Sequence, residues 1–128
     1  MKNNSSNTWK QLLCPNSGER NFHTSTLYKH YIITYGGRHN KIGINYNNFK
    51  ILNLKTGSYK DFTLQGDKPS QRYRHSACLF DSNKVLIFGG FHDNILHDTA
   101  ILTIEETSRN NYTFPQSLNP CRSFDVDL

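Results

Sequence analysis

A motif recurs in this chain at a spacing of 52 to 53 residues, and this repetition constrains the fold more than any other feature. An Arg-x-x-His motif at residues 20–23 returns at residues 72–75. Each copy is followed by a β-rich run that ends in a glycine pair, Gly36-Gly37 in the first copy and Gly89-Gly90 in the second. A period of this size indicates a repeat architecture, in which each unit is one supersecondary structure.

The segments around these landmarks predict four short strands in each unit. The first strand of a unit follows the Arg-x-x-His motif, and the second ends at the glycine pair. We expect the second, third and fourth strands at 31–35, 49–54 and 58–64 in the first unit, and at 85–88, 100–104 and 111–114 in the second. Helical periodicity is absent, and four strands separated by turn signals are typical of a propeller blade. The sequence therefore predicts an all-β fold.

In these residues the chain resembles a pair of kelch repeats, the units of the β-propeller family that includes the central domain of galactose oxidase. The kelch pattern is roughly Pro-x-x-Arg-x-x-His, a hydrophobic run ending in Gly-Gly, an Asp near the third strand, and an aromatic residue in the fourth. The second unit matches it at Pro69, Arg72, His75, Gly89, Gly90, Asp98 and Tyr112, and the first at Arg20, His23, Gly36, Gly37 and Tyr59. Ser17 replaces the proline in the first unit, and both units have tyrosine where the family usually has tryptophan.

The resemblance implies a partial propeller of two four-stranded antiparallel blades, at 19–64 and 69–115. Residues 1–7 are polar and are expected to form a flexible tail. Residues 8–13, which contain Trp9, resemble an isolated fourth strand without its blade. Residues 119–128 resemble the start of a third repeat, because Arg122 follows Arg72 by 50 residues, although Asp125 stands where the histidine should be.

Repetition of the same residues in each unit favours structural roles for them. Glycine pairs allow a sharp bend with positive φ, whereas a phosphate-binding glycine loop needs a following helix, which residues 91–94 do not suggest. An arginine offers five donors, so we expect the repeated arginines to bind backbone carbonyls between blades. The residues assigned to the structural motif are Arg20, His23, Gly36, Gly37, Arg72, His75, Gly89, Gly90 and Asp98.

One dense group of metal-ligand residue types occurs, at His92, Asp93, His97 and Asp98. Histidine and carboxylate groups bind transition metals, but the group lacks a recognised ligand spacing and Asp98 already matches the repeat motif. We therefore interpret these residues as a polar surface loop. Some kelch-like proteins are metal-dependent enzymes, among them galactose oxidase, but their ligands cannot be identified here. We predict neither a metal nor a cofactor.

Alternation of strand direction places the loops between second and third strands, and between units, at one end of the blades. These loops span residues 14–22, 37–48, 65–74 and 90–98. Loops on a rigid scaffold often carry function, and arginine and aromatic side chains are common interface anchors. Our candidates for partner contact are Arg38, His39, Tyr46, Phe91 and His92. The alternative is that these side chains only pack the loops together, and for Tyr46 the two interpretations are equally supported.

Composition excludes several other classes of protein. The net charge is +5, but the basic residues are scattered, so we do not expect nucleic-acid binding. No apolar stretch is long enough to span a membrane, and the N-terminus lacks the apolar core of a signal peptide. Three dispersed cysteines fit reduced thiols better than a disulfide framework, so we expect a cytoplasmic or nuclear location.

The expected function is a non-catalytic protein–protein interaction module, a kelch-repeat scaffold or adaptor segment that binds a protein through one propeller face. This step rests on the family resemblance, because a fold alone does not determine function. The alternative is a fragment of a kelch-like metal-dependent enzyme whose catalytic residues lie in missing blades. Two blades leave strand edges and apolar surface open, so we also expect either self-association or further blades from a longer chain.

Overall fold

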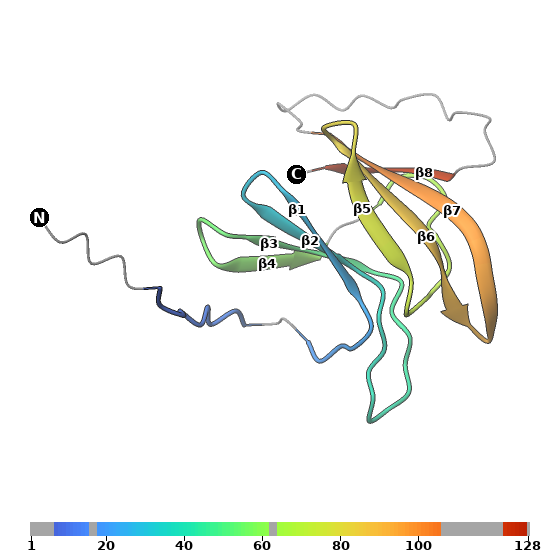
Figure 1. Ribbon diagram of the computed structural model, residues 1–128, viewed down its shortest axis with the longest axis horizontal. Helices are drawn as coiled ribbons and strands as arrows, with labels where there is room; N and C mark the ends of the chain where they lie inside the picture. Colours follow the sequence, from blue (N-terminus) through green and yellow to red (C-terminus); the bar gives the residue numbers. More distant parts are fainter. Residues whose placement is uncertain (1–6, 16–17, 62–63, 106–121, 128) are drawn as a thin grey trace, which may run out of the picture.

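The computed structural model describes residues 7–15, 18–61, 64–105 and 122–127, and these residues form two four-stranded sheets (Figure 1). The first sheet has the order β1-β2-β3-β4 and the second β5-β6-β7-β8. The strands are β1 (Thr24–Tyr28), β2 (Tyr31–Tyr35), β3 (Phe49–Asn53), β4 (Ser58–Asp61), β5 (Ser76–Phe80), β6 (Lys84–His92), β7 (Asn94–Glu105) and β8 (Arg122–Asp127). The all-β prediction is confirmed. The described residues contain no helix that is long and apolar enough to cross a membrane.

The first sheet is the antiparallel blade that the sequence predicts. Ile33 in β2 lies opposite Thr26 in β1 and Ile51 in β3, and β4 completes the sheet at its outer edge. In β1 the alternate residues Thr26 and Tyr28 are buried, and in β3 Phe49 and Ile51 are buried two residues apart, as expected for strands packed against a neighbouring layer. The fourth strand ends at Asp61, and the next two residues of its predicted range lie outside the described part of the chain.

In the second sheet the glycine pair does not end its strand, contrary to our expectation. β6 continues through Gly89 and Gly90 to His92, with a shift in its register against β7 between Phe88 and Gly90. This irregularity is a β-bulge, which bends a strand without ending it. Most of the predicted loop at 90–98 is consequently a two-stranded ribbon closed at Asp93, whose φ is 60°.

The outer position of the second sheet is occupied by residues that we had assigned to a third repeat. β8 pairs with β7 in the parallel direction, from Ala100 opposite Arg122 to Glu105 opposite Asp127. A parallel pair needs a connection of a dozen or more residues, and residues 106–121 supply that length. Residues 122–127, which fall within the range that we had assigned to a third repeat, therefore belong to the second sheet. The fourth strand predicted at 111–114 lies outside the described residues.

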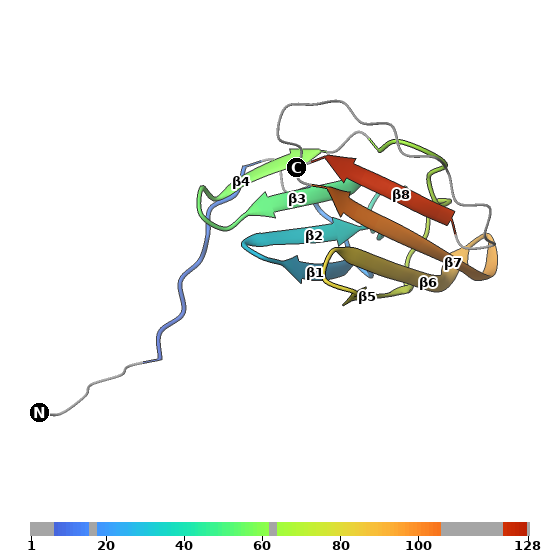
Figure 2. The same cartoon turned by 90° about the horizontal axis from the view of Figure 1, so that it is seen from above.

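The strand predicted at residues 8–13 is not formed. These residues have no strand pairing within the described chain, and Trp9 and Leu13 are exposed. Figure 2 shows this segment running away from both sheets. A strand is stabilised by hydrogen bonds to a neighbour, and a fourth strand separated from its own blade has no such neighbour here.

The core lies where the two sheets face each other, and it includes the fully buried Phe49, Ile87 and Leu102. Figure 2 shows the sheets side by side, and the first strands of the two blades, β1 and β5, are in contact. Tyr35, at the end of β2, stacks on Phe49 with 4.3 Å between ring centroids. A second ring beside Tyr35 is His75 of the second unit, at 5.2 Å and edge-on, so one core side chain contacts both blades.

Successive connections between strands lie at alternate ends of the blades, because neighbouring strands run in opposite directions. The β2–β3 loop and the β6–β7 turn lie at one end, the lower end in Figure 1. The β1–β2, β3–β4 and β5–β6 turns lie at the other end (Figure 1). We call the first end the loop face and define it by residues 18–23, 36–48, 69–75 and 91–93.

Candidate loop-face binding site

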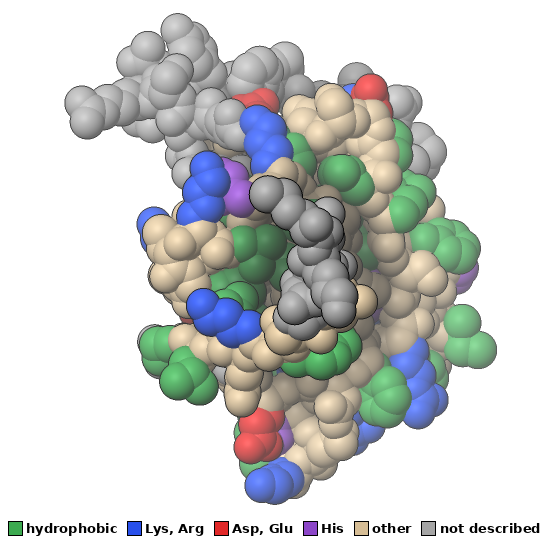
Figure 3. All heavy atoms as spheres, turned by 60° about the vertical axis from the view of Figure 1, so that its left-hand side comes forward, with side chains coloured by type: hydrophobic (Ala, Val, Ile, Leu, Met, Phe, Trp, Pro, Cys, Tyr) green, Lys and Arg blue, Asp and Glu red, His purple; other side chains and the backbone are tan. Residues whose placement is uncertain are grey.

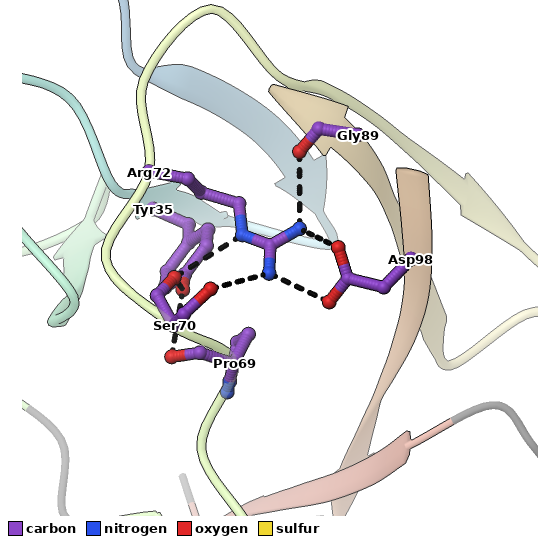
Figure 4. Close-up of polar contacts among 6 residues, drawn as sticks. All are labelled: Tyr35, Pro69, Ser70, Arg72, Gly89 and Asp98. Atoms are coloured by element: carbon purple, nitrogen blue, oxygen red, sulfur yellow. Dashed lines mark hydrogen bonds and ion pairs between the residues drawn. The ribbon is translucent and has the colours of Figure 1, made fainter. Parts of the chain in front are cut away.

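Arg72 is buried beneath the loop face and holds its segments together by hydrogen bonds. Its guanidinium is fully buried and donates hydrogen bonds to both carboxylate oxygens of Asp98, each at 2.8 Å, and to the carbonyl oxygen of Gly89 at 3.0 Å (Figure 4). It also donates to the carbonyl and hydroxyl oxygens of Ser70. Burial alone would lower the pKa of Arg72, but the hydrogen bonds and charge of Asp98 raise it above its ordinary value. The segment before β5 is thereby fixed to β6 and β7.

Arg20 has the same task in the first blade. It donates to the carbonyl oxygen of Gly36 at 3.0 Å and to the side-chain oxygen of Asn48 at 3.2 Å. Each arginine thus binds the glycine carbonyl of its own blade, whereas we had expected these bonds to run between blades. The reason is that the glycine bend turns a carbonyl toward the segment that precedes the same blade. Burial lowers the pKa of Arg20, and among the described residues no carboxylate is hydrogen-bonded to it to offset this burial as Asp98 does for Arg72.

Sequence reasoning missed Asn48. Asn48 directly precedes Phe49, which pairs with Tyr35. Asp98 occupies the equivalent position of the second repeat, because it directly precedes Thr99, which pairs with Phe88. Aligning the two repeats around the third strand would have identified this position. An amide in one blade and a carboxylate in the other accept the same arginine bond, but only the carboxylate neutralises its charge.

The two blades are joined by backbone and side-chain bonds at the loop-face end. The Tyr35 hydroxyl donates to the carbonyl oxygen of Ser70 at 2.9 Å, and the Gly37 N–H donates to the Arg72 carbonyl oxygen at 2.9 Å. The His75 ring nitrogen Nε2 lies 2.6 Å from the Thr24 hydroxyl. Burial, with the charge of Arg72, lowers the pKa of His75 to about 4. His75 is therefore a neutral residue of the blade interface.

Positive φ at the glycine pairs is confirmed, and lack of space gives a second reason for glycine. Gly36 and Gly90 have φ of 65° and 99°. A Cβ atom at Gly36 would lie 2.5 Å from the Arg72 carbonyl oxygen, and one at Gly90 would lie 2.9 Å from the Tyr73 carbonyl oxygen. Neither position has room for a side chain, because the backbone before β5 passes directly over it.

Arg38 and Phe91, two of the predicted contact residues, meet at Tyr73. The Arg38 guanidinium lies 5.5 Å from the centre of the Tyr73 ring, and the Phe91 ring approaches the same ring edge-on at 5.6 Å. Tyr73 and Phe91 also exchange backbone hydrogen bonds, with the Phe91 N–H donating at 2.9 Å. Residues from the β2–β3 loop, the segment before β5 and the end of β6 are thus brought to one place.

His92 joins this group through the β2–β3 loop. Its Nδ1 lies 2.9 Å from the side-chain nitrogen of Asn45, and Asn45 is bridged by its backbone to Arg38. The other two predicted contact residues, His39 and Tyr46, lie apart from this group and contact Glu19. His39 is 3.7 Å from the Glu19 carboxylate, and the Tyr46 hydroxyl donates to the Glu19 carbonyl oxygen. Tyr46 also lies beneath the Arg20 guanidinium, so it packs the loop.

Two residues of the Arg-x-x-His motif also belong to the group, and we did not predict them. Phe22 and Arg74 occupy the same position of the two copies, and both have left-handed backbone, with φ of 58° and 55°. The Arg74 N–H donates to the Phe22 carbonyl oxygen at 3.0 Å, and its guanidinium lies 4.6 Å from the centre of the Phe22 ring. Unlike the flanking Arg and His, these positions differ between the copies, so the repeat itself gave no signal.

The residues considered as metal ligands do not assemble into a site. Across residues 7–15, 18–61 and 64–105, no three His, Cys, Asp or Glu side chains are grouped so that they could hold a metal ion. Asp98 is bonded to Arg72, and His92 faces Asp93 at 3.6 Å. On the face shown in Figure 3, the visible Lys and Arg side chains are separated by other residues.

Comparison with known proteins agrees with this architecture. Residues 1–125 match the family described as KLHDC2/KLHL20/DRC7 Kelch-repeats domain. The chain is 30% identical over 95 residues to the Rho GTPase-activating protein gacHH of Dictyostelium discoideum. The matched segment makes up 74% of this chain and 6% of the length of that protein. Kelch-repeat domains generally mediate protein–protein interaction. The paired arginine and glycine motifs, the four-stranded antiparallel blade and the match over nearly the whole chain lead to one conclusion: this chain belongs to the kelch-repeat family.

Proposed function

We propose that this chain is a non-catalytic interaction module that binds a protein partner through its loop face. One observation carries the proposal. Arg38, Tyr73 and Phe91, from three separate segments and both blades, come together at a partly exposed cluster. Aromatic and arginine side chains are enriched among the residues that dominate binding energy in protein interfaces.

The surrounding framework supports this proposal because it holds the cluster in place before any partner arrives. Arg72 fixes the segment that carries Tyr73, and Arg20 fixes the start of the β2–β3 loop at Gly36. The loop itself is closed by the bond from the Tyr46 N–H to the Gly37 carbonyl oxygen. Side chains that are already ordered lose less conformational entropy on binding.

Site-specific photo-cross-linking tests the proposal. A photoreactive phenylalanine analogue is incorporated at Phe91 in the 128-residue chain, and the protein is irradiated in cells of its source organism. The control carries the same analogue at Lys55, an exposed residue in the β3–β4 turn at the opposite end. We expect a discrete cross-linked partner from position 91 that excess unlabelled chain displaces, and none from position 55. Equal cross-linking from both positions would contradict the proposal.

A further inference from the structure

Two arginines of the loop face are paired with no carboxylate among the residues that the structure describes. Arg38 and Arg74 both lie over the Tyr73 ring, at 5.5 Å and 5.9 Å from its centre. Within the described residues neither guanidinium makes a hydrogen bond or an ion pair. This distinguishes them from Arg20 and Arg72, whose guanidinium groups are bonded to oxygen atoms.

The two acidic residues of the loop face lie beside histidines. Glu19 lies 3.7 Å from His39, and Asp93 lies 3.6 Å from His92. Within the part of the chain that the structure describes, two positive charges therefore share one aromatic ring and neither is paired with a carboxylate. A guanidinium that rests on a ring face keeps its edge N–H groups free to donate, and this fork matches a carboxylate in two parallel hydrogen bonds.

The backbone holds both cations in position. Arg38 is part of a short ladder, bridged to Asn21 on one side and to Asn45 on the other. Arg74 is held at φ 55° by its bond to the Phe22 carbonyl oxygen. A bulky non-glycine residue rarely adopts this region, and such strained residues concentrate at ligand-binding sites. Here two of them, Phe22 and Arg74, bring a cation onto a ring.

We propose that Arg38 and Arg74 form a two-arginine site for an acidic segment of a protein partner, in which carboxylates bind the two guanidinium groups above Tyr73. The inference rests on the proposed function and adds the chemistry of the ligand. Charge complementarity carries it, because two unpaired cations from different blades converge on one ring. The partner segment therefore needs at least two carboxylates close together.

A protein segment fits this site better than a nucleic acid. Single-stranded nucleic acids bind by stacking bases on aromatic faces along a continuous basic path. Here guanidinium groups already lie over the Phe22 and Tyr73 rings, so these faces are occupied.

The experiment measures binding of short probes to the 128-residue chain, tethered at low density through its N-terminus. This tether is suitable because residues 7–13 run away from both sheets (Figure 2). The probes are an oligoglutamate peptide, an oligoglutamine peptide of the same length, and an oligothymidylate. We expect only oligoglutamate to bind, with an affinity that falls as salt is raised.

Variants locate the site. We expect Arg38→Gln and Arg74→Gln each to weaken oligoglutamate binding about fivefold, the upper range for one exposed ion pair. Lys55→Gln makes the same change of charge at the opposite end and should leave the affinity within about twofold of the unchanged chain. Each variant is first checked by its thermal melt. The Arg74 side chain is exposed, so Arg74→Gln carries the test alone if Arg38→Gln does not fold.

Three results would overturn the inference. These are no binding of oligoglutamate, equal weakening by Lys55→Gln, or binding of oligothymidylate that is as tight and as sensitive to the arginine variants. If photo-cross-linking at Phe91 succeeds while oligoglutamate fails to bind, the acidic-ligand inference fails and the proposed function stands. If both fail, the loop face is not a partner site.

Discussion

The backbone N–H of Arg74 donates a hydrogen bond to the carbonyl oxygen of Phe22, at 3.0 Å, and so joins the same position of two successive repeats. Both residues have left-handed backbone, and the Arg74 guanidinium lies over the Phe22 ring. The residue after each is the histidine of the repeat motif. His75 is buried between the blades, whereas His23 is exposed. Equivalent positions therefore have different environments, because among the described residues a preceding blade covers His75 and none covers His23.

The ion pair between Arg72 and Asp98 leads to the first prediction. Asp98→Asn retains the shape of the side chain but removes its charge, which leaves the fully buried Arg72 guanidinium without a counter-ion. Removing one partner of a buried pair typically costs about 3–5 kcal/mol, and we expect somewhat less, about 2–3 kcal/mol, because Asp98 is partly exposed. Chemical denaturation, followed by far-ultraviolet circular dichroism, measures the loss in the free energy of unfolding.

Asp81→Asn is the matched control for this change. Asp81 also pairs with a cation, Lys84, at 3.0 Å, but that pair lies at the surface. Exposed pairs contribute roughly 0–1 kcal/mol. If the two variants are destabilised equally, the buried pair does not have the role assigned to it.

The second prediction separates backbone strain from lack of space at the glycines. Gly90→Ala and Gly57→Ala both place a Cβ on a residue with positive φ, which costs about 1 kcal/mol. A Cβ at Gly57 meets no atom within 4 Å, whereas one at Gly90 lies 2.9 Å from the Tyr73 carbonyl oxygen. We expect Gly90→Ala to lose about 1–3 kcal/mol more than Gly57→Ala, and valine to be worse still at Gly90 or Gly37. Equal melting temperatures for the two alanine variants would contradict this.

The repeat made most of the fold predictable, because two copies of a motif specify the same strands twice. Periodicity could not show where pairing departs from the repeat. The bulge opposite Gly89, where β7 has one residue more than β6, depends on β7 running alongside β6, and the parallel β8 depends on an open sheet edge. Both are tertiary effects that no local pattern of residues encodes.

The candidate site was predictable only in part for a related reason. Topology places Arg38, Phe91 and His92 at one end of the blades, and the structure brings them together there. Tyr73 and Arg74 lie inside the Arg-x-x-His motif, where we looked only at the repeated residues. The residues at these two positions differ between the copies, so a search for repeated residues could not identify them.

Stability should depend on pH through His75. Its folded pKa is about 4, below the ordinary value of 6.5, because the neutral ring is buried beside Arg72. A base with a depressed folded pKa contributes stability that is complete above pH 6.5 and is lost as the pH falls toward 4. The whole interval corresponds to roughly 3 kcal/mol. Unfolding free energies from urea titrations at several pH values between 7.5 and 4.5 give the profile.

His75→Gln supplies the comparison, because glutamine can still bond to the Thr24 hydroxyl but does not titrate. This variant should be less stable at neutral pH, and the difference from the unchanged chain should shrink as the pH falls. A difference that stays constant over this range would mean that His75 does not titrate as described. Subtracting the two profiles also removes the contributions of the carboxylates, which are common to both.

The last prediction concerns the open side of the second blade. Phe88 precedes its glycine pair as Tyr35 precedes the first pair, but Tyr35 is 2% exposed beneath the second blade, whereas Phe88 is 53% exposed. Exposed aromatic surface beside strand edges recruits other chains. We therefore expect residues 1–128, expressed alone at micromolar concentration, to self-associate. Phe88→Ser should reduce this association, and Leu54→Ser, in the β3–β4 turn, should not. Size-exclusion chromatography with light scattering measures the mass, and a monodisperse species of 14.8 kDa with a sharp cooperative melt would show that two blades suffice.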